Sequence, residues 1–306
     1  MDHPIQLKDL HRWCSVPFDK LATAPGLKVP FRLVQDSAGM GEAMARDFAN
    51  EIKANNTGKK TTRAIVPCGP KSWYAPFARM VNTEKISLRA LYVFHMDECL
   101  DWQGRVLPKN HPYNFRAFME KYFYGDIEKS LAVPEAQRFF LTPQSLEKTL
   151  RAIAEAPLDI TLGGWGQDGH IAYNQTRRHP FSRITLDDLR HATARVQDNN
   201  LDTIIALGQR SFGAAYQFVP PMSVTLGVKE CLSAAKVRVF SDTGTWKQTA
   251  LRVALFSPPT TEYPLTLLQE HKDALITATI ETARHPIGEN PDWDFFGESG
   301  YFAEQA

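Results

Sequence analysis

A short apolar run in the middle of the chain stops at a cluster of glycines, and an acid and a histidine follow. The run 158–162 is typical of a buried strand, and Gly163, Gly164 and Gly166 mark its end. Asp168 and His170 come next, where open parallel sheets bind substrates. A carboxylate beside an imidazole fixes its tautomer and raises its basicity, which suits proton transfer. The alternative is that His170 caps a helix or fills a polar corner.

Two more predicted strands end in polar residues. The run 64–66 leads into Cys68-Gly69-Pro70-Lys71-Ser72, and the run 88–95 leads into Asp97 and Glu98. Acids at the end of a strand are candidates for proton transfer. Because the carboxyl ends of parallel strands meet at one edge of a sheet, we expect these groups to converge with His170.

A fourth strand end can hold an anion. After the alternating run 236–240, the segment Thr243-Gly244-Thr245-Trp246-Lys247 places a glycine turn before a lysine at the predicted start of a helix. Free N–H groups of a helix start and a lysine charge together suit a phosphate. The spacing is not that of a P-loop, and an exposed lysine at a helix start is the simpler alternative.

The elements that carry these groups alternate along the chain. Hydrophobic periodicity and turn residues predict helices over 41–55, 74–82, 114–123 and 143–154, and strands over 63–67, 88–95, 158–163, 222–227, 236–240 and 274–279. This alternation predicts an α/β fold, a doubly wound and mostly parallel Rossmann-like sheet with helices on both faces. The first ~30 residues, rich in proline and glycine, are expected to form an irregular arm.

The composition limits the possible partners. A hydrophobic fraction of 43% and a net charge of +1 are ordinary for a soluble globular protein and give no case for a nucleic-acid or membrane partner. The start of the chain, Met1-Asp2-His3-Pro4, has no leader pattern. Four scattered cysteines suggest neither disulfides nor a metal site, so we expect a cytoplasmic protein without metal or other cofactor.

Read together, these segments resemble the glucosamine-6-phosphate deaminase/isomerase family, which is related to the 6-phosphogluconolactonases. Segments 95–98 and 107–119 resemble its MDE…LPxxHPxSYxxFM signature, and 164–174 resembles GxGxDGHIAFN. Segment 219–228 resembles VPxxALTxGV, and 243–247 resembles the start of GxxKAxAL. The four motifs occur in the family's order over roughly residues 35–285. The first signature favours the deaminases over the lactonases.

The resemblance implies roles for particular residues. Asp97 matches the base that moves a proton between C2 and C1 of an open sugar, and His170 with Asp168 matches the group that opens the ring. Arg210 and Lys247 match the phosphate ligands; Gly69, Lys71 and Ser72 match a sugar-phosphate loop, and Gly164 a glycine facing the sugar. The implied activity is release of ammonia from an amino-hexose 6-phosphate with formation of a ketose phosphate, so the expected partner is a phosphorylated monosaccharide.

The chain departs from the family pattern at three places. Gln175 stands where the deaminases have a glutamate that works with the histidine, and glutamine accepts no proton near neutral pH. Pro70 and Lys71 alter the phosphate loop, and Lys229 replaces a glycine. These changes leave two alternatives open, an isomerase of another phosphorylated sugar without amine release and a sugar-phosphate sensor that has lost catalysis.

Outside the matched region lie an arm over 1–34 and a tail over 286–306. The arginine-rich stretch within 176–209 is expected to form a lid over the phosphate, as the corresponding region does in the family, although a solvated surface explains its charge equally well. The family also leads us to expect a homo-oligomer.

Overall fold

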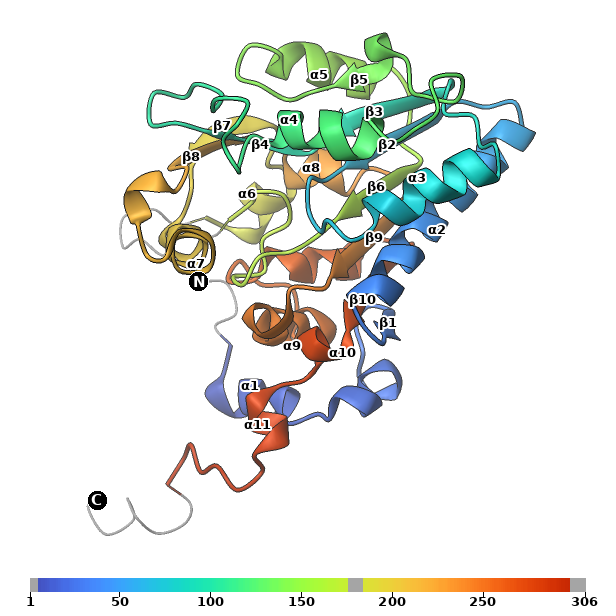
Figure 1. The fold of residues 1–306 in the computed structure, drawn as a ribbon. Coiled ribbons are helices and arrows are strands. Elements are labelled where there is room, and N and C mark those ends of the chain that lie inside the picture. The colour runs from blue at the N-terminus through green and yellow to red at the C-terminus, as the bar shows by residue number, and fades with distance from the viewer. Residues whose placement is uncertain (1–4, 176–183, 298–306) are drawn as a thin grey trace.

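The computed structural model describes residues 5–175 and 184–297 of the 306-residue chain. Its centre is a sheet of seven strands in the order β1-β10-β9-β6-β2-β3-β5, in which every neighbouring pair is parallel (Figure 1). The strands are β1 Phe31–Val34, β2 Thr62–Val66, β3 Leu91–His95, β5 Arg138–Phe139, β6 Ile160–Gly163, β9 Lys236–Ser241 and β10 Ala274–Thr279. The predicted α/β fold is confirmed.

A second sheet is small and antiparallel. It consists of β4 Asp97–Leu100, β8 Met222–Thr225 and β7 Arg195–Asp198, in the order β4-β8-β7. The register pairs Asp97 with Thr225, and Thr225 with Arg195. The run 222–227 was expected in the parallel sheet; instead it pairs with two short, polar strands that hydrophobic periodicity does not detect.

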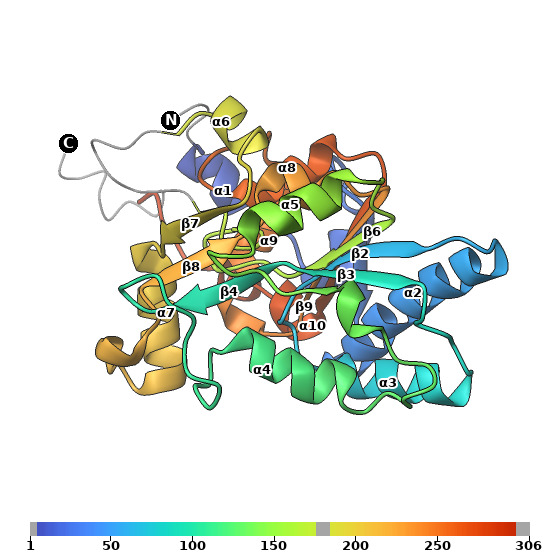
Figure 2. The same cartoon turned by 90° about the horizontal axis from the view of Figure 1, so that it is seen from above.

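Helices cover both faces of the large sheet (Figure 2). Because side chains alternate along a strand, Ala64 and Val66 pack beneath helices α2 and α3, whereas Ile65 between them belongs to the core under α5 and α9. The two cores confirm the double winding. The α-helices are α1 Leu7–Cys14, α2 Ser37–Thr57, α3 Tyr74–Thr83, α4 Phe115–Met119, α5 Leu146–Ala154, α6 Leu186–Arg190, α7 Leu201–Phe212, α8 Val228–Cys231, α9 Gln248–Phe256, α10 Ile280–Ala283 and α11 Pro286–Glu289.

The start of the chain is more regular than the sequence suggests. Residues Leu7–Cys14 form α1, which buries Trp13 and Cys14, and β1 pairs with β10 at the edge of the large sheet. The expectation of an irregular arm is therefore wrong for these residues. Apolar residues spaced three apart give α1 one apolar face, and this spacing favours a helix here although prolines follow in the sequence. The division of the chain at residues 34 and 285 stays a prediction.

The predicted lid falls partly outside the described residues. Residues 176–183 lie outside them, and the remainder of the stretch forms α6, β7 and α7. At the other end of the chain, the rings of Phe295 and Phe296 lie 5.7 and 5.4 Å from the ring of His11 on α1. Within the described residues, no helix has the length and apolar character needed to cross a membrane.

Candidate functional site

A cavity of about 650 Å³ opens at the carboxyl ends of β2, β6 and β9 and beside the start of β4. Eight of the ten predicted site residues line it, namely Gly69, Lys71, Ser72, Asp97, Gly164, His170, Arg210 and Lys247. The other two, Asp168 and Gln175, lie behind His170 and contact it. The strand ends thus converge as the sequence analysis expects.

Asp97 opens β4, directly after the buried Met96. Burial, and secondarily the charge of Glu98, raise the pKa of Asp97 to about 8. Because a carboxylate with this pKa exchanges its proton near neutral pH, it is suited to act as a general base.

Glu98 has a different task from its neighbour. Its buried carboxylate accepts backbone N–H groups of Cys99 at 3.0 Å and of Phe115 and Arg116 at 2.8 Å. Burial raises the pKa of Glu98 to about 7, although these hydrogen bonds oppose the shift. Glu98 therefore fastens the start of α4 to β4 and leaves Asp97 facing the cavity.

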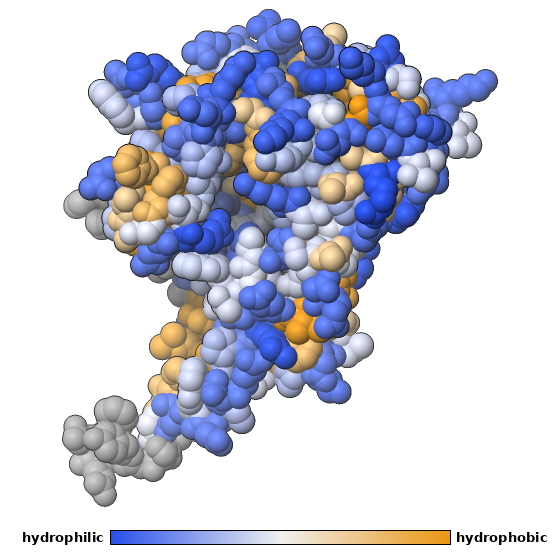
Figure 3. All heavy atoms as spheres, viewed as in Figure 1, coloured by the Kyte–Doolittle hydropathy of each residue, from blue (hydrophilic) through white to orange (hydrophobic). Residues whose placement is uncertain are grey.

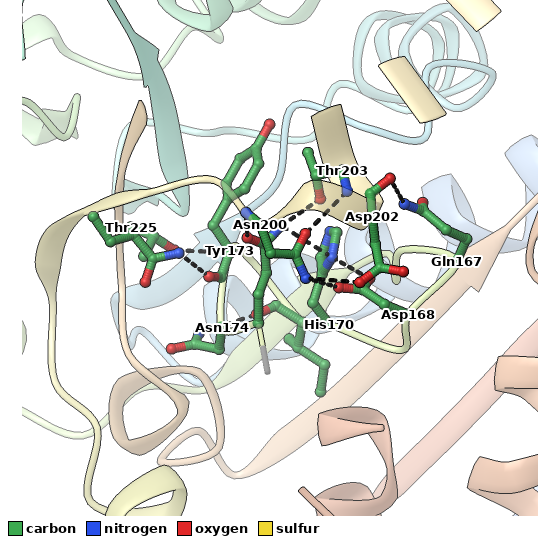
Figure 4. A network of polar contacts seen from close by, with 12 residues as sticks. Gln167, Asp168, His170, Tyr173, Asn174, Asn200, Asp202, Thr203 and Thr225 are labelled. Carbon is green, nitrogen blue, oxygen red and sulfur yellow. Dashed lines mark hydrogen bonds and ion pairs between the residues drawn. The ribbon is translucent and has the colours of Figure 1, made fainter. Parts of the chain in front are cut away.

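His170 is held by Asp168 at its Nδ1 atom, with a distance of 2.6 Å to Oδ1 (Figure 4). Burial alone would raise the pKa of Asp168, but the charge and hydrogen bond of His170, with a hydrogen bond from Asn200, hold it at about 2. Asp168 is thus ionised and accepts the Nδ1 proton, which assigns the free lone pair to Nε2.

A glycine makes room for the imidazole. A Cβ atom at Gly166 would lie 2.1 Å from Cε1 and 2.4 Å from Nδ1 of His170, so the ring rests directly on the backbone of residue 166. On its other side the ring stacks on Tyr173, with 5.7 Å between centroids. The glycine-rich stretch after β6 is therefore needed to seat His170.

Gln175 is buried, and its amide is fixed. The side-chain Oε1 accepts the backbone N–H of Asn200 at 2.8 Å, and the amide nitrogen donates to the hydroxyl of Thr203. The same nitrogen lies 3.5 Å from Nδ1 of His170. Nδ1 already donates its proton to Asp168. Gln175 therefore packs against His170 as a neutral side chain and brings no charge to it.

Two cations lie at another part of the cavity. Lys247 ends the turn Gly244–Trp246 and stands just before α9, as predicted, and its Nζ lies 5.8 Å from the centroid of the Trp165 ring. Desolvation, and then the charge of Arg210 in the last turn of α7, lower the pKa of Lys247 to about 8. Two cations near one another, of which Lys247 is partly removed from water and Arg210 is exposed, attract a dianion such as a phosphate.

The loop after β2 completes the wall. The hydroxyl of Ser72 donates to Oδ2 of Asp242 at 2.7 Å, and Ser37 donates to the same oxygen at 2.6 Å. Lys71 is exposed, with Nζ 4.1 Å from the centroid of the Phe118 ring. A Cβ atom at Gly164 would lie 3.4 Å from the carbonyl oxygen of Gly69, so this loop packs closely against the end of β6.

Sequence reasoning missed Asn200, Ser37 and Asp242. The polar triplet before the helical run 201–212 was a detectable signal for a helix N-cap at Asn200. Nothing local in the sequence signals that Ser37 and Asp242, 205 positions apart, share a hydrogen bond. Among the described residues no cluster of three metal-binding side chains is found.

The fold and the cavity place the chain among α/β proteins in which the carboxyl edge of a parallel sheet, with neighbouring elements, gathers acid–base groups and cations around one site. The chain is similar in structure to a monomeric glucosamine-6-phosphate deaminase, with a TM-score of 0.69 and 20% identity, covering 83% of this chain and 98% of the other. It is also similar to a 6-phosphogluconolactonase from Shewanella baltica, with a TM-score of 0.58 and 14% identity over 81% and 97% of the two chains. At these identities the likeness establishes the fold.

The relatives in sequence are more specific. A glucosamine-6-phosphate deaminase from Parabacteroides distasonis is 30% identical over 238 residues, which are 76% of this chain and 82% of that protein. One from Shewanella halifaxensis is 28% identical over 80% of this chain and 86% of that protein. The chain matches none of the protein-family models with which it was compared. On the strength of these relatives, the chain belongs to the glucosamine-6-phosphate deaminase family.

Proposed function

We propose that this protein converts an amino-hexose 6-phosphate, such as glucosamine 6-phosphate, into a ketose phosphate and ammonia. A proton leaves C2 of the open-chain sugar and a proton is delivered to C1, which turns the amino aldose into a ketose imine. Water then adds to the C2=N bond, and ammonia leaves. Each step moves protons and needs no change of oxidation state in a cofactor.

The proposed roles follow from the environment of each side chain. Asp97 takes the C2 proton, because its raised pKa lets it gain and lose a proton near neutral pH. His170, with Nδ1 bonded to the ionised Asp168, transfers the proton at the ring oxygen through Nε2 and so opens the closed sugar. Arg210 and Lys247 hold the phosphate, with Gly69, Lys71, Ser72 and Gly164 beside it.

One observation carries the proposal. An acid with a raised pKa, a histidine oriented by a carboxylate, and two cations all line the same cavity of about 650 Å³. Proton transfer and phosphate binding are the two requirements of aldose–ketose chemistry on a sugar phosphate.

The experiment is an assay for ammonia release from 6-phosphorylated amino-hexoses, with Asp97→Asn as the matched variant. We expect turnover by the natural enzyme, and binding without turnover by the variant. Absence of turnover of every such sugar, while Asp97→Asn binds them as the natural protein does, contradicts the proposal. Stabilisation by hexose phosphates without any turnover would identify a sensor instead.

Gln175 favours a second candidate, isomerisation of another phosphorylated sugar without loss of an amine. Its amide supplies no charge to His170, whereas family deaminases have a glutamate at this position. Gln175→Glu separates the two candidates, because a carboxylate there still accepts the Asn200 N–H and also accepts the Thr203 hydroxyl proton. If this change creates or strongly raises deaminase activity, the natural substrate is a different sugar phosphate.

The proposed setting is a homo-oligomer in the cytoplasm. All four cysteines are buried free thiols, which suits a reducing compartment. The turn after α7 carries the exposed apolar side chains Tyr216 and Phe218, and the left edge of Figure 3 shows an apolar area; such a surface supports self-association. Light scattering coupled to size exclusion measures the number of subunits.

A further inference from the structure

Asn200 stands at the start of α7, and its polar groups contact both the helix and the loop of Asp168. Its side-chain oxygen accepts the backbone N–H of Thr203 at 2.9 Å, which caps the helix. Its side-chain nitrogen donates to Oδ2 of Asp168 at 2.7 Å, and its backbone N–H donates to Gln175 at 2.8 Å. Figure 4 shows the amide of Asn200 between the helix and the Asp168–His170 pair.

The contact with Asp168 concerns the oxygen that His170 does not use. Asp168 is buried, with only 4% of the residue exposed, and Oδ1 is engaged by Nδ1 of His170. A donor on Oδ2 fixes the rotation of the carboxylate about its Cβ–Cγ bond, and thereby fixes the direction in which Oδ1 holds the imidazole. Without it, a buried charged oxygen would lose a strong, charge-assisted hydrogen bond.

We infer that Asn200 is a positioning residue, which orients the Asp168 carboxylate and through it the His170 imidazole. The inference rests on the proposed function only in assigning ring opening to His170. Asn200 is not one of the residues that line the cavity and, by this account, does not touch the sugar, so we expect its effect to be on catalysis and not on substrate affinity.

The same residue also joins the histidine to the helix that carries Arg210. The Asn200 side chain caps the first turn of α7, and Arg210 lies in the last turn. Nearby, Gln167 donates to the backbone carbonyl of Asp202 at 2.6 Å, so a second hydrogen bond ties the loop of Asp168 to this helix. The Asn200 side chain caps α7 with its oxygen and contacts Asp168 with its nitrogen. A test must therefore keep the N-cap and remove the hydrogen bond to Asp168.

Asn200→Ser and Asn200→Asp meet that condition, since serine, aspartate and asparagine are comparable N-caps. Serine removes the donor to Asp168, and aspartate places a second carboxylate against it. We expect kcat to fall roughly 10- to 100-fold in Asn200→Ser, the effect of one hydrogen bond to a charged group, and further in Asn200→Asp. The KM for the sugar phosphate should stay within about threefold. Thr185→Ser, which keeps the N-cap of α6 outside this network, is the matched control and should be unchanged.

A second readout needs no substrate. The proton shared between His170 and Asp168 across 2.6 Å should give a downfield proton NMR resonance that shifts or broadens in both Asn200 variants and not in Thr185→Ser. If the NMR signal responds but no amino-hexose phosphate is turned over by the natural protein, the positioning role stands and the proposed function fails. If the natural protein is active, and both variants keep its kcat within twofold and its NMR signal, Asn200 only caps the helix and the inference is overturned.

Discussion

Replacing Asp97 by asparagine should stabilise the protein, and the gain should grow with pH. Burial and Glu98 raise the pKa of Asp97 from 3.8 to about 8, and no described group donates a hydrogen bond to its carboxylate. Between these two pH values the folded protein keeps a proton that the unfolded chain has released. The free energy of unfolding therefore falls as pH rises through this window, by up to about 1.4 kcal/mol per pH unit. An asparagine has no such dependence.

From pH 5 to pH 7 the limiting difference is about 2.7 kcal/mol. Because Asp97 is only half-buried and water at the cavity screens it, we expect about 1–2 kcal/mol. Glu98 titrates in the same range, but Asp97 is largely protonated below pH 8, so the contribution of Glu98 is nearly equal in the two proteins.

The measurement is the free energy of unfolding from urea titrations of both proteins at pH 5, 6 and 7. The advantage of Asp97→Asn should widen steadily, while ammonia release is lost at every pH. An advantage that stays constant across the three values would show that Asp97 ionises at an ordinary pH in the folded protein. In that case its assignment as a base with a raised pKa is wrong.

Three further predictions concern the packing of His170 against residue 166 and the two cations, Lys247 and Arg210. Gly166→Ala should lower kcat by at least about 100-fold, because its Cβ meets the His170 ring, whereas Gly39→Ala, whose Cβ has only ordinary contacts, should leave kcat unchanged; steady-state kinetics of folded variants distinguish them. Binding of an acyclic hexitol 6-phosphate, followed by calorimetry, should weaken as pH rises through about 8, since Lys247 loses its charge there. Arg210→Lys should raise KM for the sugar phosphate about tenfold with a smaller change in kcat, because lysine cannot make a bidentate contact; an unchanged KM would remove Arg210 from the phosphate site.

The parallel sheet and most of the cavity could be predicted because their sequence signals are local. Strands such as β2 and β6 are buried along their whole length and contain short apolar runs, and the glycines and polar residues after them mark the site. The small sheet could not be predicted in this way. β4 begins with two acids, and its partner β8 lies more than about 100 residues further along the chain, with β7 on the other side of β8. Pairing over such separations leaves no periodic trace in a short polar strand.

The site residues divide in the same manner. His170 and Lys247 were detectable from the turn chemistry around them, whereas the contacts of Asn200 depend on how α7 packs against the loop after β6. The restrained position of Gln175 likewise follows from a backbone N–H that only the folded chain brings to it. Local patterns therefore indicate which residues can react, and tertiary packing decides how they are aimed.

The residues that line the cavity are positioned by two sheets, and each sheet has its own set of backbone hydrogen bonds. Of the residues proposed to hold the phosphate, Lys247 and those of the loops after β2 and β6 follow strands of the large sheet, whereas Arg210 lies between two strands of the small sheet, to which Asp97 also belongs. Mutations that reshape one of these sets can change the chemistry while most of the anchor for the substrate survives. If the cations hold a phosphate as proposed, a scaffold built in this way allows the reaction to change in evolution while most of the phosphate site is kept.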